Sequence, residues 1–234
     1  MTFFFLVADL FGQSYQIGDL YTAPDGSQGI IFYLHPDGSG GWAIALEDAS
    51  EVIKWAQYSP VFTGLPYFPY PSPNEYMLNA ELYKLVTDDT AGYSNTQIIR
   101  NFQASLTYPT PVAATVVDFD NGWYLPAIGQ LLRLSECLPF IREKLVNAGG
   151  TFPQGDYWSS SLRNNNEAWA VLNWSRPAGF NRTSLRHVRA VRSFVIPPVE
   201  YDTSLTYQWN TGSTAPYITP SPSQTTNYTV TATN

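Results

Sequence analysis

The side chains that most often perform catalysis are scarce in this sequence. Its 234 residues include two histidines, His35 and His187, and one cysteine, Cys137. Neither histidine has a carboxylate at the spacing of a metal site on a helix, and a single cysteine can form neither an internal disulfide nor a cysteine-based zinc site. The sequence also contains no nucleophile elbow and no Gly-rich phosphate loop. These features predict a protein that is not an enzyme and that carries no metal and no cofactor.

One short segment has the residue types of a cation site. Residues 118–122 read Asp-Phe-Asp-Asn-Gly, and calcium prefers several oxygen ligands such as those of Asp118, Asp120 and Asn121. The spacing does not fit an EF-hand loop, because the twelfth position is Gly129 where that loop needs a glutamate. The segment therefore favours a turn over a calcium site.

The composition favours an extracellular binding protein. Hydrophobic residues make up 44% of the chain and charged residues only 13%, which is about half the usual share. Ser, Thr, Asn, Gln and Tyr supply the polarity, as in surfaces that contact partners through hydrogen bonds and aromatic rings. The formal net charge is -7, and a negative surface disfavours nucleic acid and anionic membranes. We expect the partner to be a protein or a glycan on a cell, phage or host surface.

The elements expected in the central part of the chain are strands, then two helices, then strands again. The first helix is expected at 95–105 with Asn95 as its N-cap, and the second at 127–147, kinked or split by Pro139. Proline-rich residues 59–75 indicate an extended loop. The expected strands are 15–21, 29–34, 42–46, 157–160, 168–173 and 188–194.

Both ends of the chain differ from the residues between them. Residues 1–13 resemble the end of a clipped signal peptide without its basic region, or else a short hydrophobic first strand. Residues 14–197 are expected to form the main domain. Residues 198–234 are rich in Thr, Ser and Pro and predict a short all-β appendage. Its strands are expected at 207–210, 217–219 and 228–233.

Several side chains are expected to stabilise the main domain rather than bind a ligand. Trp158 and Trp169 are expected in the core, and Trp123 is expected to anchor the second helix. Arg189 and Arg192 lie three residues apart on a strand, so they point to opposite faces. We expect one to be held by a buried carboxylate or carbonyl and the other to reach outward. In the same way, His35 is expected in an exposed turn, His187 at the surface or in contact with a ligand, and Cys137 on the buried face of a helix.

The order of several short motifs resembles a known group of domains. They are Gly-Trp-Tyr-Leu-Pro at 122–126, Tyr-Trp-Ser-Ser-Ser at 157–161, Ala-Trp at 168–169 and Val-Arg-Ala-Val-Arg at 188–192. This order resembles the C-type-lectin-like domain of exported bacterial proteins, including the Fibrobacter succinogenes major paralogous domain and the collagen-like adhesin C-terminal domain. The resemblance implies an α+β, C-type-lectin-like fold with two helices packed on small twisted antiparallel sheets. It also implies a secreted or cell-surface protein.

Within that group, the chain most resembles the variable proteins of diversity-generating retroelements. In those proteins a cassette between the Tyr-Trp-Ser-Ser strand and the Val-Arg-x-Val-Arg strand is rewritten. Here the cassette corresponds to residues 162–187, whose mixed side chains fit neither a helix nor a regular strand, so the alternative is an ordinary irregular loop. The ligand-binding residues predicted on this basis are Tyr157, Leu162, Arg163, Asn164, Leu172, Asn173, Trp174, Ser175, Arg176, Phe180, Asn181, Arg182, Thr183, Leu185 and His187.

The main prediction is therefore a ligand-binding surface protein with a variable contact surface on a rigid lectin-like scaffold. A structural or adhesion module of the bacterial surface is the alternative, and the tail resembles part of an immunoglobulin-like surface repeat through 207–212 and 225–231. A relative of the formylglycine-generating oxidases is a remote third possibility, since Cys137 alone cannot supply their cysteine pair. The calcium motifs of true lectins, Glu-Pro-Asn and Trp-Asn-Asp, are absent, so calcium-dependent sugar binding is not expected.

Overall fold

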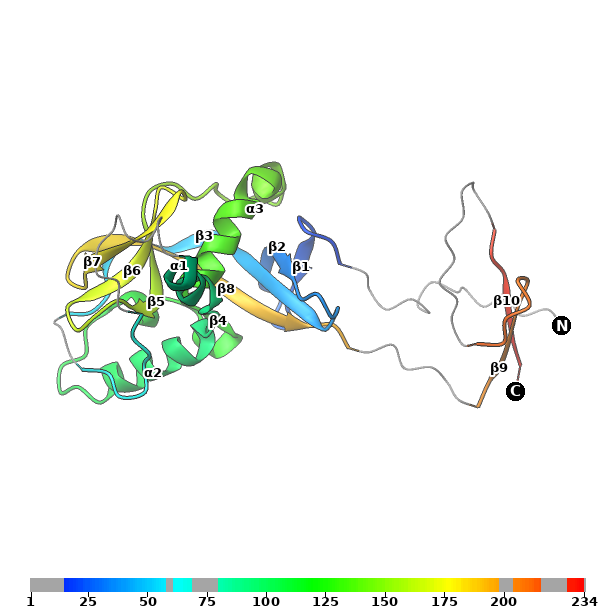
Figure 1. Cartoon of the computed structure of the whole chain (residues 1–234), viewed down its shortest axis with the longest axis horizontal. Coiled ribbons are helices and arrows are strands. Elements are labelled where there is room, and N and C mark those ends of the chain that lie inside the picture. Colours follow the sequence, from blue (N-terminus) through cyan, green and yellow to red (C-terminus); the bar gives the residue numbers. More distant parts are fainter. Residues whose placement is uncertain (1–14, 58–60, 69–79, 198–203, 216–226, 234) are drawn as a thin grey trace. The chain divides into compact units, whose positions relative to one another are not determined.

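The computed structural model describes residues 15–57, 61–68, 80–197, 204–215 and 227–233 (Figure 1). The chain divides into a main unit, Ser14–Ile196, and a second unit formed by the two ends of the chain. Residues 1–13, where a signal-like segment is expected, lie outside the described residues. The described helices include none that is long and apolar enough to cross a membrane.

The main unit is an α+β structure, as the sequence predicts at this coarse level. Its helices are α1 (Ala80–Asp88), α2 (Gly92–Ala104) and α3 (Ile128–Asn147). Its strands are β1 (Leu20–Thr22), β2 (Gln28–Leu34), β3 (Gly40–Lys54), β4 (Trp123–Tyr124), β5 (Tyr157–Leu162), β6 (Glu167–Leu172), β7 (Arg176–Asn181) and β8 (Leu185–Val195).

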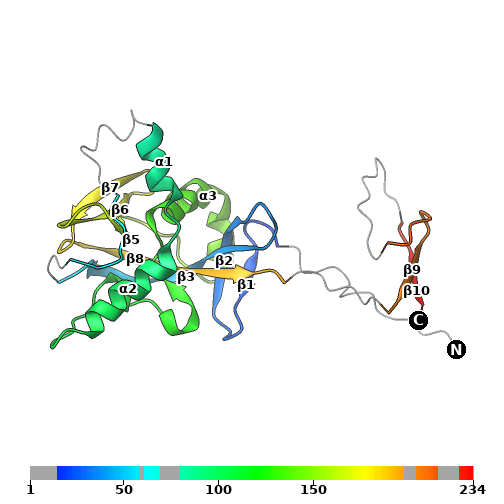
Figure 2. The same cartoon turned by 60° about the horizontal axis from the view of Figure 1, so that its bottom comes forward.

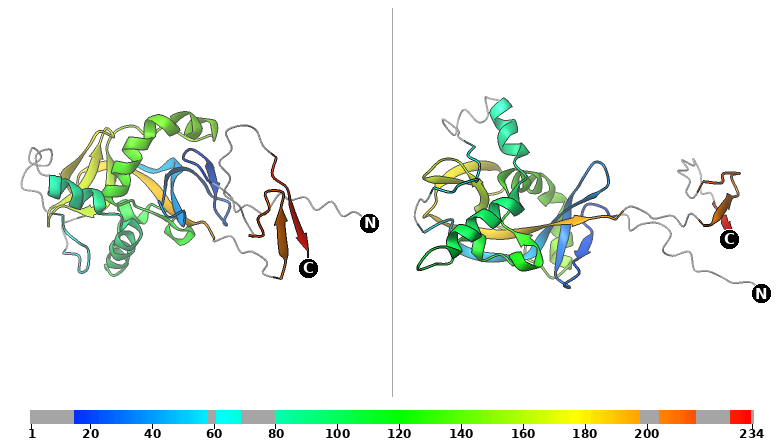
Figure 3. Two further views of the ribbon diagram at one scale, coloured as in Figure 1. Left: turned by 45° about the vertical axis from the view of Figure 1, so that its right-hand side comes forward. Right: turned by 90° about the horizontal axis from the view of Figure 1, so that it is seen from below.

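The strands form one path in the order β1-β2-β3-β8-β5-β6-β7, and β4 also pairs with β8. Neighbouring strands are antiparallel except for a single parallel contact between β5 and β8, where Tyr157 pairs with His187. This contact joins the β1–β3 side to the hairpin β6–β7, which lies at the opposite end of the main unit from β1 and β2 (Figures 1 and 3). The long strands β3 and β8 therefore connect the two ends.

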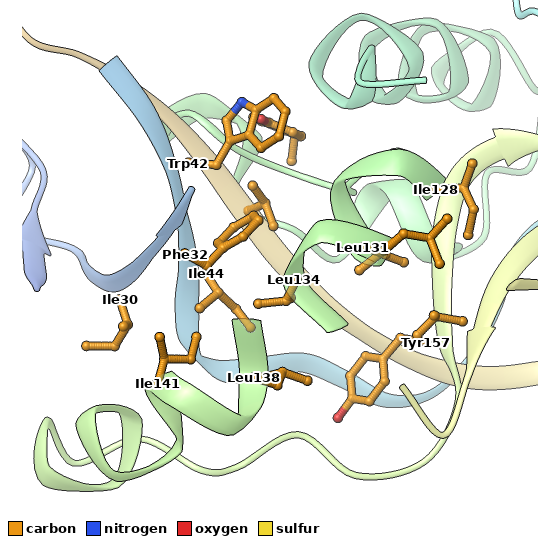
Figure 4. Close-up of a cluster of buried hydrophobic side chains, with 14 of the residues drawn as sticks. Ile30, Phe32, Trp42, Ile44, Ile128, Leu131, Leu134, Leu138, Ile141 and Tyr157 are labelled. Carbon is orange, nitrogen blue, oxygen red and sulfur yellow. The ribbon is translucent and has the colours of Figure 1, made fainter. Parts of the chain in front are cut away.

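Helix α3 supplies much of the first hydrophobic cluster. Leu131, Leu134, Leu138 and Ile141 recur at helical spacing and pack toward the sheet, as Figure 4 shows. The predicted second helix is thus present, but Pro139 does not split it, since the helix continues to Asn147. Pro139 is exposed, on the side of the helix that faces away from the cluster.

A second cluster surrounds the indole groups of three tryptophans. The indole nitrogen of Trp55 donates to the carbonyl of Ser159 at 2.6 Å, and that of Trp158 donates to the carbonyl of Ile53 at 3.0 Å. These two bonds tie the end of β3 to β5, and they agree with the prediction that Trp158 is a core residue. Trp169 is also buried. Trp123 belongs to this second cluster and bonds to Ser27, so it packs beside β2 and is not the anchor of α3 that the sequence suggested.

Three local predictions are wrong at the level of single elements. Asn95 is not an N-cap, because α2, which Figure 2 labels, begins at Gly92, and Asn95 lies buried inside this helix. Helix α1 was not expected at all. The segment around residues 176–181 was expected to be irregular and is strand β7. For Asn95 and β7, contacts with strands β5 and β6 outweigh the weak local pattern, whereas α1 packs on α3.

The second unit contains the antiparallel pair β9 (Thr206–Trp209) and β10 (Val230–Thr233). The indole nitrogen of Trp209 donates to the carbonyl of Ala215 at 2.9 Å. Two of the three strands predicted for the tail are therefore present, and the third, at 217–219, lies outside the described residues.

Candidate ligand-contact face

The segment predicted to contact a ligand forms a hairpin. Strands β6 and β7 pair in continuous antiparallel register from Glu167↔Asn181 to Leu172↔Arg176. The centre of β7 is Pro177-Ala178-Gly179, which lacks the large β-branched residues that mark a strand in sequence. Pairing with β6 supplies the order that the local sequence does not show. The candidate contact residues are thus presented by a regular scaffold.

The turn of this hairpin has an unusual backbone. Asn173 and Trp174 both have positive φ, at 44° and 55°, and Ser175 N donates to Leu172 O at 2.9 Å. This bond makes Asn173 and Trp174 the two central residues of a β-turn, and positive φ at both is typical of the type I′ turn, which matches the twist of the strands. Asparagine adopts this region readily, whereas a bulky residue such as tryptophan does so at a cost.

Two contacts hold the turn in place. Asp156 Oδ1 accepts a hydrogen bond from Asn173 N at 3.1 Å. The Trp174 ring lies 4.7 Å from the Tyr157 ring, centroid to centroid, and packs against the first cluster. The indole nitrogen of Trp174 is buried and makes no hydrogen bond in the described part of the chain. The turn is therefore fixed from the loop before β5 and from β5 itself.

Three of the predicted contact residues are buried, and this corrects the sequence prediction. Tyr157 is the first residue of β5 and Leu162 is the last, and all six residues of this strand are buried. Arg182 is also buried, with its guanidinium 5.5 Å from the centre of the Trp55 ring and 5.7 Å from that of Phe62. These side chains cannot touch a partner directly, so we assign them to the framework.

The other predicted residues are exposed or partly exposed, and they separate into two groups. The first group lies at the far end of the hairpin, away from the β6–β7 turn. There Asn164 Oδ1 accepts hydrogen bonds from the amides of Asn166 and Glu167, and Asn181 Oδ1 accepts from the amide and hydroxyl of Thr183. Both amide oxygens are therefore already hydrogen-bonded within the chain. Arg163 bonds to Glu167 at 2.6 Å. The second group lies at or near the β6–β7 turn and consists of Leu172, Asn173, Trp174, Ser175, Arg176, Leu185 and His187.

Four residues of the second group line one depression of about 380 Å³, namely Leu172, Asn173, Leu185 and His187. Phe180 does not line this depression. The guanidinium carbon of Arg186 lies 3.4 Å from the centre of the Phe180 ring and covers that ring. The structure adds wall residues that sequence reasoning missed, namely Glu51, Val52, Gly155, Asp156 and Arg186. Extension of β3 to Lys54 brings the first two beside β8, and no local pattern in the sequence indicates this extension.

A buried ionic network supports the floor beside this depression. Arg189 Nε donates to Asp48 Oδ1 at 2.5 Å, and its Nη1 donates to the carbonyl of Leu46 at 2.6 Å. Tyr157 donates its hydroxyl proton to Asp48 Oδ2 at 2.7 Å. Burial raises the pKa of Tyr157, and the charge of Asp48 raises it further, so the phenol stays neutral and keeps its role as donor.

The prediction for the two arginines of β8 is confirmed for Arg189, which is buried and held by a carboxylate and by carbonyl oxygens. The side chain of Arg192 is only 15% exposed, because it donates to the carbonyl of Asn121 and lies 3.5 Å from Asp25. His187 lies beside the network, with Nδ1 3.3 Å from Asp48 Oδ2. The network thus consists of mutually paired groups, which hold the backbone of β3 and β8 in register.

The remaining residues of the sequence that could take part in catalysis or metal binding lie in a turn or on a helix. Residues 119–121 form a single 3₁₀ turn, with Asn121 Nδ2 donating to Asp118 Oδ2 at 2.9 Å. The predicted turn is therefore confirmed, and the described residues include no group of three potential metal ligands. Cys137 is half-buried on α3, and burial raises the pKa of its thiol to about 11. His35 lies in the turn after β2, with its ring edge against Tyr33.

Comparison with known proteins gives a likeness in fold. No family model matches the chain, and no curated protein sequence matches it. Among solved structures, the chain is similar to a fimbrial protein from Bacteroides ovatus, with a TM-score of 0.53 and 19% sequence identity. The similarity covers 77% of this chain and 49% of that protein, so the chain spans about half its length. At this identity the comparison shows a shared fold.

Proposed function

We propose that this protein is an adhesion module of a bacterial cell surface, and that it binds its partner without chemical change. The observation that carries the proposal is the ordered hairpin turn, on which exposed polar side chains stand over a buried, ion-paired framework. A rigid scaffold that presents such side chains pays little conformational entropy on binding. The fold shared with a fimbrial protein supports the surface location.

The same proposal includes a C-type-lectin-like fold for the main unit. Its support is the order of the resembling motifs and their places in the structure. The Gly-Trp-Tyr-Leu-Pro motif at 122–126 contains β4, and the Tyr-Trp-Ser-Ser-Ser motif is β5. The Val-Arg-Ala-Val-Arg motif lies in β8, which pairs with both. These motifs thus meet at the centre of the fold.

The contact face that we propose is the turn end of the hairpin. Asn173, Ser175 and Arg176 are exposed there, and Leu185 is exposed on the adjacent strand β8. The amide of Asn173 and the guanidinium group of Arg176 supply adaptable hydrogen bonds, and the partly exposed Trp174 adds rigid aromatic area. The hydroxyl of Ser175 donates to Leu172 O at 2.8 Å and keeps its capacity to accept. The far end has fewer unoccupied side-chain groups, since its asparagines cap their own turns.

The direct experiment is a binding screen of the purified protein against a glycan array and a panel of bacterial and host cells. A turn variant combines Asn173→Gly and Arg176→Ala, which remove two exposed side chains, and retains Ser175, whose hydroxyl and amide both bond to Leu172 O. A far-end variant combines Asn165→Ala, Asn166→Ala and Thr183→Ala, which are equally exposed. We expect the turn variant to lose at least about tenfold in affinity and the far-end variant to bind like the wild type. The reverse pattern would move the contact face, and no binding to any surface would contradict the proposal.

A second candidate function is a variable protein diversified by a retroelement. One observation favours it: nine of the 26 residues in 162–187 are exposed, and these could change without altering the seven that are buried. The test is genomic. A reverse-transcriptase gene and a near-copy of the segment that encodes residues 162–187 should lie near the gene. Their absence would leave the adhesion module without a hypervariable site.

A further inference from the structure

Two neighbouring depressions beside the hairpin turn share walls. The first, of about 380 Å³, is described above. The second has a volume of about 260 Å³ and lies over the buried ionic network, lined in part by Glu47, Asp48 and Phe152. Glu51 and His187 line both depressions. The two hollows are therefore adjacent parts of one concave surface between β3, β8 and the loop before β5.

The outer wall of the first depression is apolar. Val52 is 66% exposed and Leu185 is 58% exposed, although both are aliphatic. They come from neighbouring strands, since Ile53 pairs with Arg186 and Lys54 with Leu185. Leu172 adds a third aliphatic side chain from the hairpin. Exposed aliphatic groups on one side of a hollow suit a chain of methylene groups, which loses contact with water when it lies against them.

The charge around the hollows is negative. Four carboxylates line them, from Glu47, Asp48, Glu51 and Asp156, against two guanidinium groups. Both guanidinium groups are already engaged, because Arg189 bonds to Asp48 at 2.5 Å and Arg186 lies 3.8 Å from Asp156. The residues that line the two hollows therefore include more carboxylates than guanidinium groups, and both of these guanidinium groups are engaged by carboxylates.

Glu51 is the carboxylate best placed to meet a ligand. It is exposed, and it makes no hydrogen bond or ion pair with any other residue that the structure describes. Glu47, by contrast, accepts from the hydroxyl of Thr151 at 2.7 Å. Glu51 and Val52 follow one another on β3, and regular alternation would place their side chains on opposite faces. The β3–β8 register shifts between Ser50 and Ile53, and both residues line the first hollow, so the Glu51 carboxylate shares a wall with the aliphatic side chains. An acceptor beside methylene-sized apolar surface matches an ammonium group at the end of an aliphatic stem.

We propose that this concave surface binds a lysine side chain displayed by the partner protein. The stem lies against Val52, Leu172 and Leu185, and the ammonium group donates hydrogen bonds to Glu51. The inference rests on the proposed function, since it names the chemistry by which the contact face recognises its partner. Charge complementarity between a protein of net charge -7 and a basic partner also accelerates their encounter.

The test uses two small probes that differ in charge. Nα-acetyl-lysine amide carries the ammonium group, and Nα-acetyl-norleucine amide has the same aliphatic stem without it. Each is titrated into the ¹⁵N-labelled full chain, and the backbone amide signals of Glu51, Asn173 and His187 are followed. We expect the lysine probe to shift these signals and to bind about tenfold more tightly than the norleucine probe.

Matched variants locate the charge that is responsible. Glu51→Gln should weaken the lysine probe about fivefold and leave the norleucine probe unchanged. Glu136→Gln makes the same change in charge at an exposed position of α3 that lines neither hollow, and it should have no effect. Equal binding of both probes, or no loss in Glu51→Gln, would overturn the inference.

The surface-binding screen separates failure of the inference from failure of the function. If the wild type binds a surface and the turn variant does not, but the lysine probe leaves all signals unmoved, the contact face stands and the lysine site is wrong. If neither the screen nor the probe shows binding, both fail. If the probe binds through Glu51 and the turn variant still adheres normally, the lysine site is real and the proposed contact face is wrong.

Discussion

Strand β8 and the hairpin β6–β7 belong to the same sheet, carry similar residue types and behave differently. In β8, Arg189 is buried and bonds to a carboxylate and to backbone carbonyls, so it holds β3 in place. In the hairpin, Arg176 is exposed at the turn and contributes little to the core. Framework residues and contact-face residues are therefore distinguished by their burial and their hydrogen bonds, and not by residue type alone.

The largest expected effect comes from removing the centre of the framework. Arg189→Ala removes the cation that pairs with Asp48 and the donor to three carbonyl oxygens in a buried site, and should lower the free energy of unfolding by about 3–5 kcal/mol. Arg176→Ala should change it by less than about 0.5 kcal/mol. Urea unfolding monitored by tryptophan fluorescence measures both. Similar losses in the two variants would erase the distinction between framework and contact face.

The same comparison can be made with two leucines of the predicted cassette. Leu162 is fully buried at the end of β5, so Leu162→Ala should cost about 2–5 kcal/mol. Leu185 is 58% exposed, and Leu185→Ala should cost less than about 0.5 kcal/mol. Thermal unfolding with both variants side by side checks the pair. A tolerated Leu162→Ala would mean that the start of the cassette is not framework after all.

The sequence predicts the framework better than the contact face. Helix α3 is predictable because its leucines repeat with helical spacing over twenty residues. Strands β5 and β8 are predictable because apolar and aromatic residues dominate them. Strand β7 is not, since Pro177, Ala178 and Gly179 carry no strand signal and its order comes from pairing with β6. Helix α1 has only nine residues and follows a proline-rich segment, so its amphipathic pattern covers too few turns to mark a helix on its own.

The candidate site could be predicted only in part, for the same physical reason. Leu172, Asn173, Leu185 and His187 were identified, because they lie in one unpatterned segment. Glu51, Val52 and Asp156 come from segments that are distant in sequence and meet the hairpin only through the β3–β8 pairing. Tyr157, Leu162 and Arg182 were assigned to the surface wrongly, since sequence position does not show which face of a strand is covered.

A smaller effect is expected at the turn itself. Asn173→Val places a β-branched residue at positive φ and should destabilise the fold by about 1–2 kcal/mol. Asn173→Gly meets no such penalty and should change stability by only a few tenths of a kcal/mol, at about the limit of measurement. Chemical denaturation of the two variants tests whether the left-handed backbone persists in solution. Equal stabilities would show that the turn relaxes.

The framework should also respond to pH through Asp89. Burial raises the pKa of this carboxyl, although hydrogen bonds from Ser161 and from the amide of Ala91 oppose the shift. Its contribution to stability is therefore fully present below the unfolded pKa of about 3.9 and is lost as pH rises through the folded pKa. Asp89→Asn should flatten the dependence of unfolding free energy on pH above about pH 4. The exposed neighbour variant Asp88→Asn should leave that dependence as in the wild type, and an identical slope in all three proteins would show that Asp89 is not perturbed.

The most direct test of the account is a footprint of the bound protein. Hydroxyl-radical labelling of the chain, free and bound to the surface that captures it in the screen, reports which side chains the partner covers. We predict protection of Trp174, Leu185 and Val52, with unchanged labelling of Tyr108 and Phe140, which are exposed elsewhere. Protection of Tyr108 or Phe140, with the hairpin turn as reactive as in the free protein, would contradict the claim that the turn end of β6–β7 is the contact face.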